Sequence, residues 1–182
     1  MTTIYPELLI PKGIESIIVD ETIIEIPKCK VKFEKYNGEK ITDTFGGKPI
    51  ITLKGKPAFA ELAIMNYFIE DGWDSRWVET YGKGKMTPML LSKWDEGNYK
   101  SQEHNPITDE YILDILKGIS SLNGNSFYGC WDVLAWKGNK IIFAESKRTK
   151  KDSIRDTQIN WLKAALQFGL IKDNFLMVEW DI

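Results

Sequence analysis

The chain has 182 residues, of which 43% are hydrophobic and 27% charged, and its formal net charge is −2. These values are ordinary for one soluble globular domain, and the slightly acidic balance excludes a generally basic nucleic-acid coat. One histidine and two cysteines exclude a Cys-rich zinc site and a disulfide framework. With no apolar run of membrane-spanning length and no signal-peptide pattern, we expect a cytoplasmic protein that does not bind membranes.

Residues 1–56 are predicted to form a β-rich segment. Their runs of Ile and Val are interrupted by Pro27 and by Asn37-Gly38, a pattern typical of short antiparallel strands joined by turns. The stretch KPIITL at residues 48–53 adds a further strand. We expect this segment to be an extension that packs on a core formed by residues 57–182.

The stretch PAFAELAIMNYFIEDG at residues 57–72 predicts a buried helix that begins at a proline and ends at Gly72. The helix is apolar almost all round, so Glu61 stands alone on an apolar face. The simplest interpretation is that Glu61 reaches solvent at the helix edge or caps an internal amide, since carboxylates are seldom buried unpaired.

Residues 75–81 predict a strand, and the polar segment from Gly82 to Pro106 has little periodicity, which indicates a functional or mobile loop. The next helix is better marked. Thr108 is its predicted N-cap, Ile107 can pack on Ile112, and the sequence NGN after Leu122 ends it. Residues 82–125 together are predicted to be an insertion in the core.

The segments FYGCWDVLAW and KIIFAESK flank Gly138-Asn139, a pair typical of a two-residue β-hairpin turn. If these two residues form the turn, Asp132 lies directly opposite Glu145. Opposed residues share a face of the sheet with Cβ atoms about 5 Å apart, and like charges there repel. Lys147 lies on the same face because side chains alternate along a strand.

This hairpin predicts a divalent cation between Asp132 and Glu145. Carboxylate oxygens are the ligands that Mg²⁺ prefers. A lysine beside the ion can orient or deprotonate a water and offset charge on a phosphate. The alternative is a surface hairpin in which both carboxylates face water and Lys147 neutralises Glu145. The E-x-K spacing alone does not distinguish these two interpretations.

The stretch KRTKKDSIR after this strand predicts a basic loop, which either holds a phosphate backbone or is simply solvated. A helix follows at residues 154–169, with Asp152 or Ser153 as its N-cap, and it places Gln158 on the inward stripe. The stretch NFLMVEW predicts a buried strand. The β-helix-β order favours a parallel pair with the Glu145 strand.

The order of these features resembles the PD-(D/E)xK nuclease superfamily: a glutamate on a first helix, an aspartate opening a strand, ESK on the next strand and a glutamine on the following helix. The run GCWDVLAWKGNKIIFAESKRTKKDSIRDTQINWL resembles its virus-type replication-repair (VRR-NUC) branch in particular. The resemblance covers about residues 57–180. Trp131 stands where the family usually has a proline before the aspartate.

The resemblance implies an α/β fold with a restriction-endonuclease-like core, in which a mixed sheet of an antiparallel meander plus one parallel strand is flanked by helices. It implies that Asp132, Glu145 and Glu61 bind Mg²⁺, with Mn²⁺ as a substitute. Lys147 would be the catalytic lysine, and Gln158 would support the site. The implied activity is metal-dependent hydrolysis of phosphodiester bonds in nucleic acid, with DNA as the first expectation.

Basic side chains near this site are expected to contact phosphates, and these are Arg148, Lys150, Lys151 and Arg155, together with Lys83, Lys85 and Lys93 in the polar segment. The runner-up hypothesis is a non-catalytic nucleic-acid-binding or structural relative with the same fold. A third is a protein-interaction domain with a Trp-rich surface. The sequence leaves open DNA versus RNA, exonuclease versus endonuclease, and monomer versus homodimer.

Overall fold

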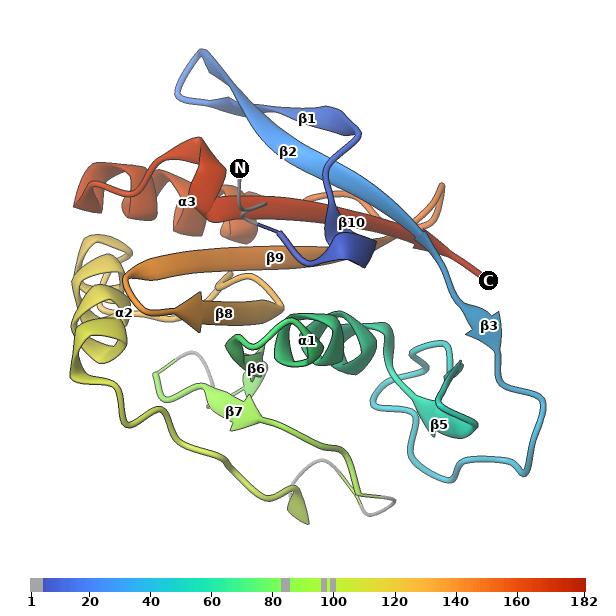
Figure 1. Cartoon of the computed structure of the whole chain (residues 1–182). Coiled ribbons are helices and arrows are strands. Elements are labelled where there is room, and N and C mark those ends of the chain that lie inside the picture. Colours follow the sequence, from blue (N-terminus) through green and yellow to red (C-terminus); the bar gives the residue numbers. More distant parts are fainter. Residues whose placement is uncertain (1–4, 83–85, 96–97, 99–100) are drawn as a thin grey trace.

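The computed structural model describes residues 5–82, 86–95, 98 and 101–182 (Figure 1). Its centre is a mixed sheet whose strands, in spatial order, are β1 (Gly13–Val19), β2 (Thr22–Lys32), β10 (Phe175–Asp181), β9 (Lys140–Arg148), β8 (Val133–Lys137), β6 (Asp74–Glu79) and β7 (Met89–Leu91). A small sheet contains β3 (Glu34–Lys35), β4 (Ile51–Leu53) and β5 (Lys56–Ala58). The helices are α1 (Ala60–Glu70), α2 (Glu110–Leu122) and α3 (Asp156–Phe168), with short 3₁₀ turns η1 (Glu7–Leu9) and η4 (Lys172–Asn174).

The predicted meander and parallel strand are both present. Strands β6, β8 and β9 pair antiparallel in succession. After α3 the chain returns as β10, which lies parallel to β9. The predicted α/β architecture, a mixed sheet flanked by helices, is therefore confirmed.

The N-terminal strands belong to the same central sheet. Strand β2 lies parallel to β10 on the side away from β9, and β1 pairs antiparallel with β2 at the edge. Pro27 does not break β2, contrary to the prediction. The Lys28 carbonyl faces β1, so the backbone nitrogen of the preceding Pro27 faces the opposite side of the strand, toward β10. Pairing of β2 with β10 begins only at Lys28, so no partner strand needs an N–H from Pro27.

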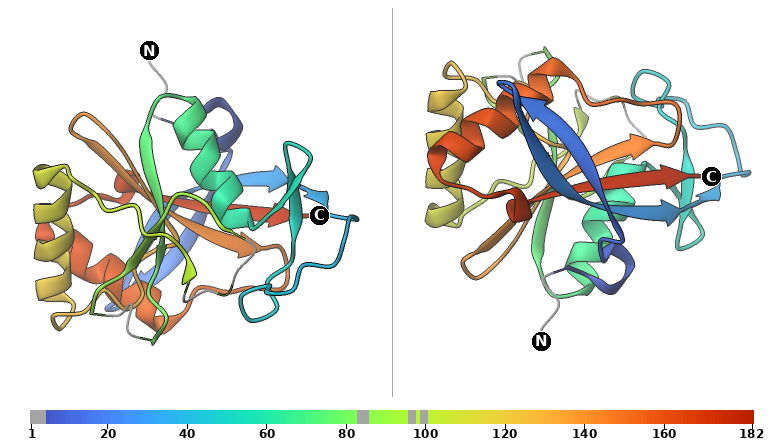
Figure 2. Two further views of the ribbon diagram at one scale, coloured as in Figure 1. Left: turned by 90° about the horizontal axis from the view of Figure 1, so that it is seen from below. Right: turned by 90° about the horizontal axis from the view of Figure 1, so that it is seen from above.

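The two faces of the sheet bury separate hydrophobic cores. Helix α1 covers one face, with Phe68 and Trp77 in its core. Helices α2 and α3 lie side by side on the other, over Phe143 and Trp161 (Figure 2). Successive residues of β9 enter opposite cores, as strand geometry requires. At the end of β9, Glu145 and Lys147 therefore point to the face that α3 covers, where Gln158 hydrogen-bonds to both.

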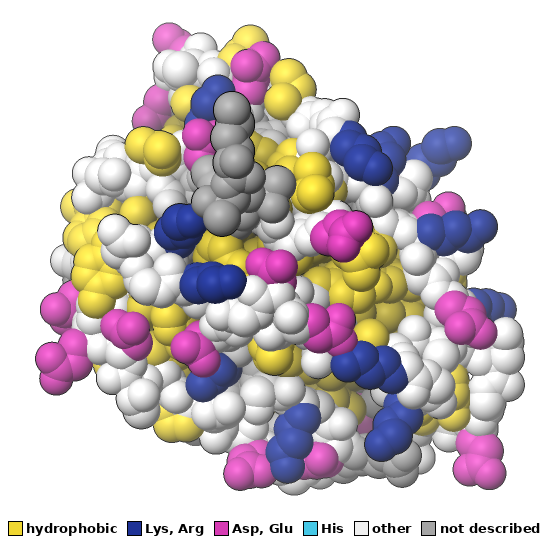
Figure 3. Space-filling view, viewed as in Figure 1, with side chains coloured by type: hydrophobic (Ala, Val, Ile, Leu, Met, Phe, Trp, Pro, Cys, Tyr) yellow, Lys and Arg dark blue, Asp and Glu magenta, His cyan; other side chains and the backbone are white. Residues whose placement is uncertain are grey.

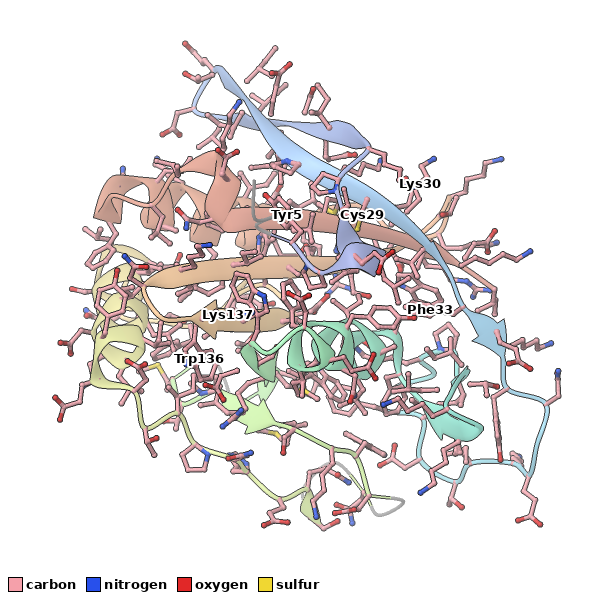
Figure 4. The ribbon with its side chains drawn as sticks, in the orientation of Figure 1. Tyr5, Cys29, Lys30, Phe33, Trp136 and Lys137 are labelled. Atoms are coloured by element: carbon pink, nitrogen blue, oxygen red, sulfur yellow. The ribbon has the colours of Figure 1, made fainter. Side chains whose placement is uncertain are left out.

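Helix α1 is tied to the β8–β9 hairpin by a direct hydrogen bond. Lys137, at the end of β8, reaches toward the C-terminal end of α1, where its ammonium donates to the Asp71 carbonyl oxygen at 2.7 Å (Figure 4). This contact joins the element that carries Glu61 to the hairpin that begins after Asp132.

Two details of the polar segment differ from the prediction. Met89–Leu91 is not loop but strand β7, because it pairs with the outer side of β6. The N-cap of α2 is Asp109, whose carboxylate accepts the Ile112 N–H at 3.3 Å. An aspartate at this position satisfies a free amide of the first turn as well as the predicted threonine would.

In the part of the chain that the structure describes, no helix is both long and apolar enough to cross a membrane. Cys29 and Cys130 are free thiols, and both are buried.

Candidate active site

The β8–β9 hairpin has the predicted register. Lys137 lies opposite Lys140 and Val133 opposite Ala144, so Gly138-Asn139 forms the turn. Gly138 has a φ of 60°, a conformation that glycine adopts without strain. Asp132 precedes β8 by one residue, and its carboxylate accepts the Ser146 N–H at 2.9 Å. The turn thus brings Asp132 beside Glu145.

Glu145 is buried, with only 1% of its surface exposed. Its Oε1 accepts from Lys147 Nζ at 2.8 Å and from Gln158 Nε2 at 2.5 Å. Its Oε2 is buried and receives no hydrogen bond from a donor group among the described residues, and the Asp132 carboxylate is close enough to share a proton with Glu145. Burial and then the neighbouring Asp132 raise the pKa of Glu145, while Lys147 partly opposes them. Two adjacent carboxylates are satisfied only by a shared proton or a cation.

Gln158 connects the members of this site through its side-chain amide. The amide nitrogen donates to Glu145, and the amide oxygen accepts from Lys147 Nζ at 3.0 Å and from the Arg155 N–H at 2.9 Å. Because this oxygen serves the backbone N–H that opens the helix, α3 begins after Arg155 and not after the predicted Asp152 or Ser153.

The segment that leads to Asp132 packs directly on the first turn of α3. Gly129 has a φ of 85°, and a Cβ there would lie 2.0 Å from the Thr157 carbonyl oxygen. The Trp131 indole N–H donates to the Gln158 carbonyl oxygen at 3.2 Å. Only glycine permits this close approach, which fixes the distance between Asp132 and Gln158.

Glu61 does not reach solvent, so the simplest interpretation of its position in the sequence is wrong. The residue is 7% exposed, and its carboxylate pairs with the ammonium of Lys48. Lys48 Nζ also lies over the Trp77 ring at 5.3 Å and the Phe45 ring at 5.6 Å. A buried carboxylate on an apolar helix is thus compensated by a lysine from a turn elsewhere in the sequence.

Glu79, at the end of β6, is a fourth acidic residue near the site. Burial raises its pKa, Lys48 lowers it, and Asp132 and Glu61 raise it further. Burial alone would lower the pKa of the Lys48 ammonium, but Glu61, Asp132 and Glu79 together hold that pKa above its ordinary value. Lys48 therefore lies among three carboxylates. Sequence analysis identified neither Lys48 nor Glu79, because no motif or periodicity marks them.

The predicted metal ligands are only partly brought together. Asp132 and Glu145, with the unpartnered Oε2, fit a cation that takes one or two carboxylates. The third predicted ligand, Glu61, is engaged by Lys48. Among the described residues, no three acidic, histidine or cysteine side chains form one metal-binding group. The arrangement thus fits a two-carboxylate site with Glu61 held apart.

The predicted phosphate-contacting residues have mixed environments. Arg148 lies over the Trp180 ring at 5.9 Å, and Lys150, Lys151 and Arg155 are exposed. Lys93 is already paired with Glu103 at 2.8 Å and Asp95 at 3.6 Å. Lys83 and Lys85 lie outside the described residues. The exposed cations therefore come from the loop that follows β9.

A pocket of about 100 Å³ opens beside Lys147, and the basic loop forms one of its walls. Lys28, Arg148 and Lys150 line it together with the acidic Glu15 and Glu179. Basic and acidic side chains are also interspersed on the face shown in Figure 3. The charge that lines the pocket is thus mixed and not uniformly basic.

Comparison with protein-family models, with curated proteins and with solved structures found no match to this chain. Functional inference therefore depends on the geometry of the site and on the motif residues themselves.

Proposed function

We propose that this chain is a cytoplasmic, metal-dependent nuclease that hydrolyses phosphodiester bonds in nucleic acid, with DNA as the first candidate substrate. In this proposal the resemblance to the PD-(D/E)xK superfamily and its VRR-NUC branch reflects a shared mechanism. Asp132 and Glu145 would bind Mg²⁺ or Mn²⁺, and Glu61 would be an additional ligand.

One observation carries the proposal. Glu145 keeps a buried oxygen without a hydrogen-bond partner among the described residues, next to the carboxylate of Asp132 and 2.8 Å from Lys147 on its other oxygen. A structural ion pair needs one carboxylate for one lysine. A second carboxylate at this place raises the energy of the metal-free protein, and that cost is explained if the pair binds a cation.

The chain's own residues have separable roles in this proposal. Bound Mg²⁺ would polarise a phosphoryl oxygen and lower the pKa of a water that it holds. Lys147 would donate to a phosphate oxygen as charge develops there. Gln158 holds both Lys147 and Glu145 through its amide, so it would fix their positions without touching the substrate.

The strand of nucleic acid would follow the loop after β9. Arg148, Lys150 and Lys151 extend from a turn that the Arg148 carbonyl closes by accepting the N–H groups of Lys151 and Asp152, both at 3.1 Å. This turn also borders the pocket beside Lys147. Phosphate groups held there would lie next to the proposed metal site.

The second candidate is a nucleic-acid-binding relative with the same fold and no turnover. The exposed cations Lys150, Lys151 and Arg155 favour this alternative, because phosphate binding needs them and does not need the paired carboxylates. The unpartnered Glu145 oxygen favours the enzyme, because a protein that only binds nucleic acid gains nothing from two adjacent carboxylates.

The test is incubation of the purified chain with labelled single-stranded, duplex and branched DNA and with RNA, in Mg²⁺, Mn²⁺ or EDTA. We expect cleavage with Mg²⁺ or Mn²⁺ and none with EDTA. Binding without cleavage of any substrate would favour the non-catalytic relative. Neither binding nor cleavage, together with no metal-dependent rise in melting temperature, would exclude both candidates.

A further inference from the structure

The turn that carries Lys48 has an unusual backbone. Phe45, Gly46 and Gly47 all have positive φ angles, of 50°, 77° and 87°, and the Lys48 N–H donates to the Thr44 carbonyl oxygen at 2.9 Å. The left-handed region is strained for a phenylalanine, so its surroundings must hold it there. The Phe45 ring contacts Trp94 and Trp77, with ring centroids 5.4 and 6.0 Å away. The aromatic contacts therefore anchor the turn at Phe45.

The ammonium of Lys48 lies where three separate elements meet. It pairs with Glu61 of α1, and it interacts electrostatically with Glu79 of β6 and with Asp132 before β8. Its side chain is 28% exposed, whereas that of Glu61 is 10% exposed. A single positive charge from a turn thus compensates acidic groups that include two of the three proposed metal ligands.

We propose that Lys48 is a tethered cation, which holds Glu61 in the metal-free protein and competes with the divalent ion for that carboxylate. The inference rests on the proposed metal site and adds a residue to it. Metal would bind first to Asp132 and Glu145. Glu61 would join only after the Lys48 ammonium has moved away from it.

The turn is built to allow this movement. Gly46 and Gly47 are exposed, and a Cβ added at either would meet no atom within 4 Å, so neither glycine is buried against other groups. Phe45 can stay among its aromatic neighbours while the two glycines change conformation, because glycine adopts many φ and ψ values. Lys48 can then leave Glu61 without disturbing the core.

The tethered cation has two opposite effects on the protein. Without metal it stabilises the fold, because Glu61 would otherwise be a buried carboxylate with no cation beside it. With metal it lowers the affinity, because the positive charge of the Lys48 ammonium beside Glu61 repels a second cation at the same carboxylate. Removing the charge of Lys48 should therefore lower the stability of the metal-free protein and raise its metal affinity.

The experiment measures Mn²⁺ binding by electron paramagnetic resonance, without nucleic acid, for wild type and Lys48→Met. We expect Lys48→Met to bind Mn²⁺ about tenfold more tightly and to melt at a lower temperature when metal is absent. Lys54→Met is the matched control. Lys54 pairs with Glu70 at the other end of α1, at 2.5 Å and with both side chains exposed, so this change should alter neither quantity.

The outcomes separate this inference from the proposed function. If wild type and both variants bind no Mn²⁺, the metal site itself is excluded and the inference falls with it. If wild type binds Mn²⁺ and Lys48→Met binds it equally or more weakly, the tethered cation is wrong while the nuclease proposal stands.

A second measurement needs no variant and covers the case in which Lys48→Met does not fold. Wild type is treated briefly with an amine-acetylating reagent, with and without Mn²⁺, and the labelled lysines are quantified by mass spectrometry. We expect Mn²⁺ to increase acetylation of Lys48 several-fold and to leave Lys54 unchanged. Unchanged or reduced labelling of Lys48 in protein that binds Mn²⁺ would overturn the inference.

Discussion

Two carboxylate–lysine pairs lie near Asp132, and they are built in different ways. Glu145 and Lys147 belong to one strand, two residues apart, and Gln158 holds both side chains from α3. Glu61 and Lys48 come from a helix and from a turn, and among the described residues no third side chain hydrogen-bonds to both. The first pair is thus held by a third side chain, and the second is not.

The difference explains why two similar pairs would serve different purposes. Gln158 hydrogen-bonds to both Lys147 and Glu145, so we expect Lys147 to keep one position before and after a ligand binds. Such a position suits a group that stabilises a transition state. A lysine on a turn with two glycines can be displaced by a stronger cation. We therefore assign chemistry to the first pair and metal access to the second.

Asp132 is close to both lysine pairs, so its replacement should have the largest effect. Asp132→Asn removes a proposed charged ligand, and we expect nuclease activity and the metal-induced rise in melting temperature to be lost. The metal-free variant should be more stable than wild type, because the repulsion with Glu145 is relieved. Thermal melts with and without Mn²⁺, beside a cleavage assay, measure all three. A variant that keeps its response to Mn²⁺ would contradict Asp132 as a ligand.

Lys147→Ala should keep metal binding and lose turnover. We expect the cleavage rate to fall by about a hundredfold or more, as for loss of a transition-state contact. Lys140→Ala is the control on the same strand, since Lys140 is exposed at the far end of the hairpin. Single-turnover cleavage and Mn²⁺ affinity, measured on both variants, distinguish a catalytic lysine from a structural one. Equal cleavage rates for the two variants would exclude a catalytic role for Lys147.

Replacing one supporting residue in each pair should have smaller effects, and the comparison separates the two pairs. Gln158→Ala loosens Lys147, so we expect about a tenfold lower rate with nearly unchanged Mn²⁺ affinity. Glu61→Gln removes a proposed ligand, so its main effect should be a weaker Mn²⁺ affinity. Rates measured across a series of Mn²⁺ concentrations decide this. If saturating Mn²⁺ restores Gln158→Ala but not Glu61→Gln, the two roles are assigned the wrong way round.

The stability of the metal-free protein should depend on the protonation of Glu145. Burial and Asp132 raise its pKa in the folded state, so the folded protein retains this proton at a pH where the unfolded chain has lost it. Stability from this group is complete below about pH 4, the ordinary range of a glutamate pKa, and declines as the pH rises. Glu145→Gln should gain stability relative to wild type at neutral pH, because glutamine carries no charge that burial and Asp132 oppose. Urea unfolding at several pH values checks this. A difference that does not grow with pH would contradict the raised pKa.

Outside both pairs, the basic loop should contribute only affinity. Lys150→Ala should weaken nucleic-acid binding a few-fold and reduce the salt slope by about one, without changing sequence preference. Lys140→Ala is the control, because Lys140 is exposed at the far end of the hairpin. Binding isotherms at several salt concentrations measure the slopes. Equal slopes for wild type and Lys150→Ala would indicate a solvated loop.

The sequence by itself determined the features that depend on local rules. Gly138-Asn139 set the turn, so the register that brings Asp132 beside Glu145 and Lys147 followed from counting along two strands. Helical spacing placed Gln158 on the inward face, and the strand-helix-strand order predicted the parallel pairing of β9 with β10. Turn geometry and periodicity depend on residues that are close in the sequence, so both can be predicted from the sequence alone.

Only the tertiary structure decided which groups compensate the acidic residues. Lys48 reaches Glu61 because Phe45 packs among Trp77 and Trp94, which come from different parts of the chain. Pro27 lies inside β2 because β10 begins to pair only at the next residue. These contacts follow from how the sheet, α1 and the turn pack together. Residues that pair across such distances in sequence form no periodic pattern. In the sequence alone, Lys48 therefore cannot be distinguished from a lysine that faces solvent.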